Sequence, residues 1–293
     1  VVMESYAYAA PTSIDEATAL LAAHASDGRS AQILAGGTDV LVQMRNANRT
    51  PRTIIDIKCL DETNRLEVNA DHVYIGSAVA SARMQENLQL QQLFPGVLEA
   101  ADLIGSTQIQ GRATVCGNLC NASPAGDSIP ALIAVGAVCD IATRDGRREI
   151  AVEDFVIGVG RNALVDGEFL LGLKLPLPRT GTKDAYLRFT PRTEMDIAVA
   201  GAAVSVTVED GMCRAARVAI GAVATTALLV PEAANALVGS KLDEAALYAA
   251  GAACQAAAKP ISDKRGSAAY RKKIIAVLCC RAIQIAHDRV TEQ

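Results

Sequence analysis

Two short segments combine glycine with small polar residues, the residue types that bind phosphates and sugars through backbone amides. Residues 34–40 read L-A-G-G-T-D-V, and residues 113–127 read A-T-V-C-G-N-L-C-N-A-S-P-A-G-D. Glycine lets a ligand approach the backbone closely and adopts positive φ without strain. A helix-like pattern follows each segment, and the free N–H groups of a helix start favour an anion. We therefore expect two loops that hold parts of a polar ligand.

The first segment matches neither of the common phosphate-binding motifs. It is too short for a P-loop and lacks the lysine of that motif, and it is not G-x-G-x-x-G. Two glycines after a short strand still expose backbone N–H groups, and Thr38 adds a hydroxyl donor. The residues leave two interpretations open, a pyrophosphate cradle and a plain strand–helix turn. Two such loops on one chain favour one ligand that touches both, and a dinucleotide is long enough.

Ionisable side chains offer no obvious catalytic group. Asp127 stands at the start of a predicted helix, where it could cap the helix or accept a hydrogen bond from a ligand's ring N–H or ribose hydroxyl. Its residue type leaves both roles open. His24, His72 and His287 are scattered along the chain, so we predict no general acid–base pair and no catalytic residue.

Composition limits the class of protein. With 293 residues, 51% hydrophobic and 20% charged, the chain should fold as a globular protein of two or three subdomains. The net charge of −4, without a long basic block, argues against a nucleic-acid partner. We find no apolar run long enough for a membrane span and no signal-like N-terminal pattern, so we expect a cytoplasmic protein. The eight cysteines form no C-x-x-C pair and predict free thiols without a metal site.

Hydrophobic periodicity predicts a change of architecture near residues 176–182, which read P-L-P-R-T-G-T. Before this stretch, a capping box at Ser13 and Glu16 predicts a helix start. Strands are predicted there at 32–35, 53–57, 73–76, 138–143 and 168–175, with helices at 81–88 and 94–104. After it, antiparallel strands are predicted at 185–189, 199–208 and 217–221, and helices at 231–238, 242–258 and 267–289.

Four segments in this order resemble a known family: 34–40, 114–127, 192–198 (R-T-E-M-D-I-A) and 261–270 (I-S-D-K-R-G-S-A-A-Y). They resemble the FAD-binding medium subunit of the molybdenum hydroxylases, which include carbon monoxide, xanthine, N-heterocycle and nicotine dehydrogenases. The resemblance covers nearly the whole chain and implies an α+β fold. A two-lobed FAD-binding domain of the vanillyl-alcohol-oxidase type would occupy residues 1–177, with the lobes split near residue 58. Residues 178–293 would form an α+β domain with a three-stranded antiparallel sheet and helices.

The resemblance also implies cofactor-binding residues. Those expected to wrap the pyrophosphate are Ile33, Leu34, Ala35, Gly36, Gly37, Thr38, Asp39 and Val40. Those expected in the second wall are Thr114, Gly117, Asn118 and Ser123. Ile104 and Leu170 would lie near the isoalloxazine, and Asp127 would hydrogen-bond the adenosine or ribityl part. Arg188 stands where some relatives carry a lysine near the flavin. Cys116 replaces a usual glycine, which requires a negative φ at that residue.

The function implied by the resemblance is electron transfer within a complex. A large subunit would hold the molybdopterin cofactor, and a small subunit would pass electrons through 2Fe–2S clusters to FAD on this chain. FAD would then reduce an external acceptor, and a dimer of heterotrimers is expected. The chain lacks the cysteine-rich insertion that holds a 4Fe–4S cluster in some relatives, so none is expected here. Two alternatives stay open, a self-contained flavin oxidoreductase and an assembly subunit without cofactor. The substrate of the complex and its acceptor (NAD, a quinone or oxygen) are not readable from the sequence.

Overall fold

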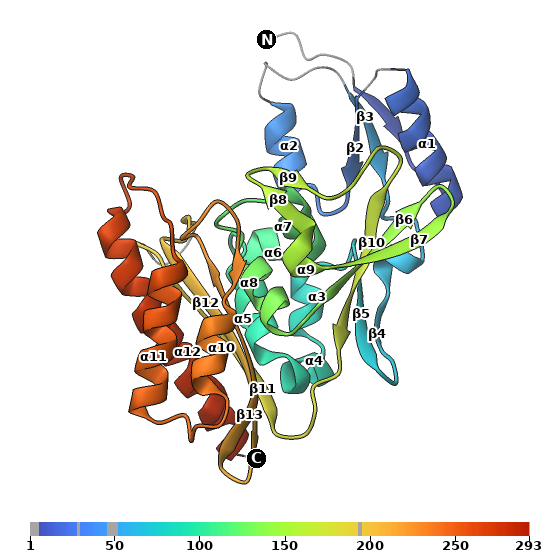
Figure 1. Ribbon diagram of the computed structural model, residues 1–293. Coiled ribbons are helices and arrows are strands. Elements are labelled where there is room, and N and C mark those ends of the chain that lie inside the picture. Colours follow the sequence, from blue (N-terminus) through green and yellow to red (C-terminus); the bar gives the residue numbers. More distant parts are fainter. Residues whose placement is uncertain (1–5, 28–29, 46–51, 193–194, 293) are drawn as a thin grey trace.

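The protein is described by a computed structural model that covers residues 6–27, 30–45, 52–192 and 195–292. It confirms the predicted α+β class, with a parallel sheet, two antiparallel sheets and a short hairpin. Figure 1 shows the N-terminal elements in blue at the upper right and the C-terminal helices in orange and red at the left. No helix in the described part of the chain has both the length and the apolar character needed to cross a membrane.

The first lobe is a small parallel sheet with the strand order β1-β3-β2. Its elements are β1 (Ala7–Ala9), α1 (Ile14–Ser26), β2 (Ser30–Leu34), α2 (Thr38–Met44) and β3 (Arg52–Asp56). The capping box before α1 is only half formed. Ser13 Oγ accepts from the Glu16 N–H at 3.1 Å, whereas the Glu16 carboxylate accepts from the Thr12 N–H at 2.8 Å. The carboxylate thus reaches one residue further back than the motif predicts.

The second lobe is a five-stranded antiparallel sheet in the order β4-β5-β10-β6-β7. The strands are β4 (Leu66–Val68), β5 (His72–Gly76), β6 (Val138–Thr143), β7 (Gly146–Ala151) and β10 (Phe169–Pro176). A 3-10 turn, η1 (Glu62–Asn64), precedes β4, and a hairpin of β8 (Val156–Gly158) and β9 (Arg161–Asn162) follows β7. The helices are α3 (Ser81–Gln85), α4 (Leu88–Leu93), α5 (Pro95–Asp102), α6 (Thr107–Gln110), α7 (Val115–Asn121), α8 (Ser128–Ala134) and α9 (Val152–Phe155).

Two sequence predictions in this lobe are wrong in detail. The helix predicted at 81–88 is broken, because the Asn87 side chain accepts from the Leu90 N–H at 3.0 Å and starts α4. The segment 113–127, predicted as a loop, contains the helix α7. Thr114 caps it through the Gly117 N–H at 2.9 Å, and Ala122 ends it at φ 49°. Val115, Cys116 and Leu119 bury one side of α7 in the core, which the small and polar composition obscured. Cys116 has helical backbone and therefore meets the requirement for a negative φ.

The C-terminal part is an antiparallel sheet with one helical layer. Its strands are β11 (Thr182–Phe189), β12 (Ala200–Glu209), β13 (Met212–Gly221) and β14 (Leu228–Leu229), and its helices are α10 (Pro231–Leu237), α11 (Glu244–Ala257) and α12 (Ala268–Thr291). The sheet has four strands rather than three, since β14 adds two residues along the edge of β13. Such a short strand leaves no alternating pattern in the sequence.

This sheet is covered on both faces. The helices α10, α11 and α12 share one apolar core with β11, β12 and β13. The opposite face packs on α5 and α8 of the second lobe, where Tyr186, Ala203 and Ala219 join the core of that lobe. The first lobe has a core of its own, which Phe169 and Leu171 of β10 extend into the second lobe. The molecule thus has three cores, and two of them take in residues of a neighbouring part of the chain, which packs the parts against one another.

Candidate cofactor site

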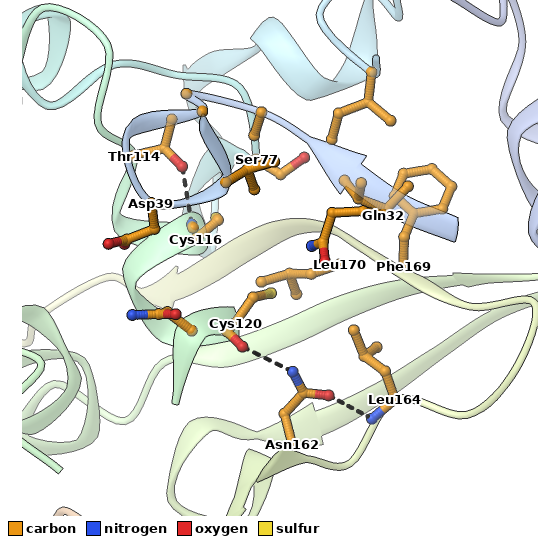
Figure 2. Close-up of a pocket in the computed structure, with 18 of the residues that line it drawn as sticks. Gln32, Asp39, Ser77, Thr114, Cys116, Cys120, Asn162, Leu164, Phe169 and Leu170 are labelled. Atoms are coloured by element: carbon orange, nitrogen blue, oxygen red, sulfur yellow. Dashed lines mark hydrogen bonds between the residues drawn. The ribbon is translucent and has the colours of Figure 1, made fainter. Parts of the chain in front are cut away.

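A cavity of about 650 Å³ lies between the first and second lobes. Residues of β2 and α2 line one side, and residues of α7, β9 and β10 line the other (Figure 2). Its volume falls in the range of roughly 300–1,000 Å³ that is typical of cofactor and small-molecule sites. It is the meeting place of the two glycine-bearing segments, as the sequence predicts for one long ligand.

The first segment turns sharply between β2 and α2. Gly37 has φ +82°, which glycine adopts without strain, and a Cβ atom on Gly36 would lie 2.0 Å from the Arg112 carbonyl oxygen. Both glycines are therefore required by the backbone geometry. The N–H groups of residues 36–40 donate no hydrogen bond to any residue that the structure describes, and the first helical bond joins the Leu41 N–H to the Gly37 oxygen at 3.0 Å. Five successive donors are thus free to bind acceptor atoms in the cavity.

The second segment forms the facing wall of the cavity. More of its polar groups are already hydrogen-bonded within the protein. Thr114 uses its hydroxyl oxygen on α7, and the Asn118 Oδ1 accepts from the Ser128 hydroxyl at 2.8 Å. Asn121 Oδ1 accepts from Gln43 Nε2 at 3.4 Å, a contact that joins α7 to α2 across the cavity. These bonds stiffen the wall, while the Asn118 side-chain N–H groups bond to no described residue and remain free for a ligand.

Apolar side chains close the cavity, among them Ile104 and Leu170. Two thiols also line it. Burial raises the pKa of the Cys116 thiol, whose Sγ lies 3.9 Å from the Ile75 carbonyl oxygen, and raises the pKa of Cys120 to about 12. Both thiols are therefore neutral near pH 7 and act as apolar packing groups rather than nucleophiles.

Asp127 belongs to a buried ion pair. Its carboxylate accepts from Arg188 Nη1 at 2.6 Å and from the Tyr186 hydroxyl at 2.9 Å, and it makes no side-chain bond that caps α8. Burial raises the pKa of Asp127, while Arg188 and Tyr186 oppose this shift. Arg188 Nη1 also donates to the Leu103 carbonyl oxygen at 3.1 Å, so the pair holds the turn next to Ile104.

The structure brings most of the predicted site residues together. Those that line the cavity are Ile33, Ala35, Gly36, Gly37, Thr38, Asp39, Val40, Ile104, Thr114, Gly117, Asn118 and Leu170. Those that lie outside its lining are Leu34, Ser123, Asp127 and Arg188. The two C-terminal segments of the resemblance lie beside each other, joined by Arg265 Nε and Asp196 Oδ1 at 3.1 Å, and are also outside the lining. Thr193 and Glu194, within the third of these segments, fall outside the described residues.

Sequence reasoning missed the lining residues between β8 and β10. Gly160 and Gly167 both have positive φ there, and a glycine count over this stretch could have marked it. Asn162 anchors the stretch to α7, because its Nδ2 donates to the Cys120 carbonyl oxygen at 2.9 Å and its Oδ1 accepts from the Leu164 N–H at 3.2 Å (Figure 2). Ser77 also lines the cavity, and no feature of the sequence pointed to it.

Comparison with known families agrees with this geometry. Residues 4–178 match the FAD-binding domain in molybdopterin dehydrogenase, and residues 185–286 match the CO dehydrogenase flavoprotein C-terminal domain. The first match alone covers more than half of the chain. The chain therefore belongs to the family of FAD-binding medium subunits of the molybdenum hydroxylases, which are oxidoreductases.

Individual relatives match over nearly their full length. The carbon monoxide dehydrogenase medium chain of Afipia carboxidovorans is 34% identical over 286 residues, which are 97% of this chain and 98% of the relative. The caffeine dehydrogenase subunit beta of a Pseudomonas species is 30% identical and covers 98% of this chain and 96% of its own. A chain in a crystal structure of the Cu,Mo-CO dehydrogenase superposes with a TM-score of 0.93 at 32% identity, covering 99% of this chain and 100% of that one.

Proposed function

We propose that this chain is the FAD-carrying electron-transfer subunit of a molybdenum-containing dehydrogenase complex. The observation that carries the proposal is the row of free N–H donors at residues 36–40 along a cavity of about 650 Å³. Such a row suits a diphosphate, whose oxygen atoms accept several hydrogen bonds at once. Gly36 allows the turn that presents these donors, because only a residue without Cβ fits against the Arg112 carbonyl oxygen there.

The residues of the cavity divide into roles toward FAD. Residues 36–40 would hold the diphosphate, and the Asn118 amide would donate to the ligand from the facing wall. Ile104 and Leu170 would pack against the isoalloxazine. The ion pair of Asp127 and Arg188 lies outside the cavity lining and would contribute by fixing the turn at residues 103–104. Bound FAD supplies the redox chemistry, and the chain supplies binding, orientation and shielding from water.

Leu34 and Ser123 would also act from outside the lining. Leu34 lies beside the turn, because a Cβ on Gly37 would come within 2.9 Å of its Cδ1 atom. The Ser123 Oγ accepts from the Ala125 N–H at 3.3 Å and so shapes the segment that leads to Asp127. We propose that both residues support the cradle and the wall rather than touch the cofactor.

The names of the relatives support a proposal for the partner chains. The terms medium chain and subunit beta denote members of multi-subunit enzymes. We propose a large subunit with the molybdenum cofactor and a small subunit with 2Fe–2S clusters that reduces the flavin of this chain, which in turn reduces an external acceptor. We further propose a division into an FAD-binding domain at 1–177 and a C-terminal domain at 178–293, supported by the separate core of α10, α11 and α12 with their sheet.

The experiment is purification of the tagged chain with its native partners, followed by acid release and identification of any flavin. We expect FAD, and we expect substrate to bleach the flavin absorbance only while the partner chains are present. A complex without flavin would overturn the cofactor assignment. Bleaching of the isolated chain by a small organic substrate would overturn the electron-transfer role in favour of a self-contained oxidoreductase.

A further inference from the structure

The side chain of Ser77 lines the cavity without a partner. It follows the last residue of β5 and is only 3% exposed. Among the described residues, its Oγ has no hydrogen-bond partner, although it is buried. Figure 2 shows Ser77 between Thr114 of the second segment and Gln32 of β2. A buried hydroxyl can donate one hydrogen bond and accept others, and leaving it unpaired costs free energy.

The backbone around Ser77 is held firmly, which fixes where the hydroxyl lies. The Ser77 N–H donates to the Leu171 carbonyl oxygen at 3.0 Å, and the next N–H, of Ala78, donates to the Thr63 oxygen at 2.8 Å. Gly76 packs closely on the same segment, since a Cβ there would lie 2.3 Å from that same Thr63 oxygen. The orphaned hydroxyl therefore belongs to a well-anchored residue of the cavity lining, which also includes the apolar side chains of Cys116 and Leu170.

Contacts near Ser77 indicate where it lies relative to the two glycine-bearing segments. On one side, the Cys116 thiol of α7 points to the carbonyl of Ile75 in the same strand. Further along, the Ser81 N–H donates to the Ala113 oxygen at 2.8 Å, and Ala113 is also among the atoms nearest to Gly36. Ser77 thus lines the cavity near the place where the two glycine-bearing segments approach each other.

From this geometry we infer that Ser77 is a cofactor-binding residue, whose hydroxyl hydrogen-bonds an oxygen atom in the sugar–phosphate part of FAD. The inference rests on the proposed function, because it needs a dinucleotide in the cavity. The role differs from that of residues 36–40, which offer backbone donors that truncating a side chain does not remove. Ser77 contributes a side chain, so Ser77→Ala, which removes only the hydroxyl group, isolates its effect.

The test compares three versions of the flavin-free full chain: wild type, Ser77→Ala and Ser205→Ala as a matched control on β12, away from the cavity. Titration with FAD, followed by flavin fluorescence, gives the Kd of each. We expect Ser77→Ala to raise the Kd about 3- to 10-fold, the effect of losing one hydrogen bond. Ser205→Ala should match the wild type.

The melting temperature of the flavin-free chain provides the second readout. Because the Ser77 hydroxyl has no described protein partner to lose and its unpaired burial costs free energy, Ser77→Ala should melt no more than about 2 °C below the wild type, or above it. A Kd for Ser77→Ala within twofold of the wild type would overturn the inference while leaving the proposed function intact. A large drop in melting temperature would show a structural role instead. A wild-type chain that binds no FAD would overturn both proposals.

Discussion

The two glycine-bearing segments of this chain meet in one cavity but reach it by opposite means. In the first, at residues 34–40, the N–H groups of residues 36–40 bond to no described residue, and these residues line the cavity. The second, at 113–127, folds into α7 and commits Thr114, Asn118 and Asp127 to bonds within the protein. Similar compositions therefore produce a cradle in one place and a stiff wall in the other. The difference lies in whether a side chain is present to cap the helix start.

That contrast has a local physical cause. Gly37 precedes α2 and has no side chain to accept from the first turn, so the donors of that turn remain free for a ligand. Thr114 precedes α7 and satisfies one donor itself. A binding site needs both kinds of segment, because free donors bind only where the facing wall holds its shape.

The largest effect is expected from a substitution that disrupts the turn at residues 36–40. In Gly36→Ala, the added Cβ would meet the Arg112 carbonyl oxygen at 2.0 Å and force the turn to open. We expect FAD affinity to fall by at least about 1,000-fold, or roughly 4 kcal/mol. The control is Gly111→Ala, where the nearest atom would lie 3.7 Å away. Calorimetric titration of both variants with FAD checks this, and equal affinities would mean that the turn does not bind the cofactor.

The second effect concerns the buried ion pair of Asp127 and Arg188, at the end of the second segment. Arg188→Met leaves the Asp127 carboxylate buried without its cation, and we expect a loss of about 3–5 kcal/mol in the free energy of unfolding. The double variant with Asp127→Asn should recover part of this loss. For comparison, Lys174→Met removes a more exposed partner of Glu149 and should cost at most about 1 kcal/mol. Urea unfolding measures all three, and a loss from Arg188→Met as small as that from Lys174→Met would contradict the buried-pair account.

The third effect compares Asp127 with a buried carboxylate to which no described cation bonds directly. Asp184 Oδ2 of β11 accepts from the Val97 N–H at 3.1 Å, while Arg289 bonds to its backbone oxygen and to Glu99. Burial raises the pKa of Asp184 from 3.8 to about 7. The unfolded chain therefore loses this proton first as the pH rises.

The resulting stability contribution is full below pH 3.8 and is lost as the pH rises toward 7. The wild type should lose about 2–4 kcal/mol more than Asp184→Asn between about pH 4 and 7. Urea unfolding across this pH range provides the measurement. Parallel pH profiles for the two proteins would show that Asp184 titrates with an ordinary pKa.

The smallest effect concerns the cap of α7. Thr114→Ala removes the acceptor for the Gly117 N–H and should destabilise the chain by about 1 kcal/mol, whereas Thr114→Ser should restore the cap. Because the wall contributes shape rather than most of the donors, FAD affinity should fall less than about 10-fold in Thr114→Ala. A loss as large as that of Gly36→Ala would erase the distinction between cradle and wall.

The sequence predicted elements correctly where a residue pattern is compatible with only one kind of secondary structure. Short apolar runs predicted β5, β6 and β10 within a residue or two. The predictions were wrong where a single side-chain hydrogen bond determines where a helix begins. Thr114 turned an expected loop into α7, and Asn87 split an expected helix in two.

The candidate site shows the same division. The meeting of the two glycine-bearing segments could be predicted because two such loops on one chain favour one ligand that touches both. Ser77, by contrast, is one serine among many, and only the fold shows that its hydroxyl is buried without a partner. The pairing of Asp127 with Arg188 joins residues 61 positions apart, which no local pattern reveals.

The most direct test of the central claim is a crystal structure of the full chain with FAD bound. The account predicts that the diphosphate oxygens lie within about 3 Å of at least three of the backbone N–H groups of residues 36–40. The isoalloxazine should lie at the end of the cavity closed by Ile104 and Leu170. A diphosphate bound elsewhere, with these N–H groups facing only solvent, would contradict the account.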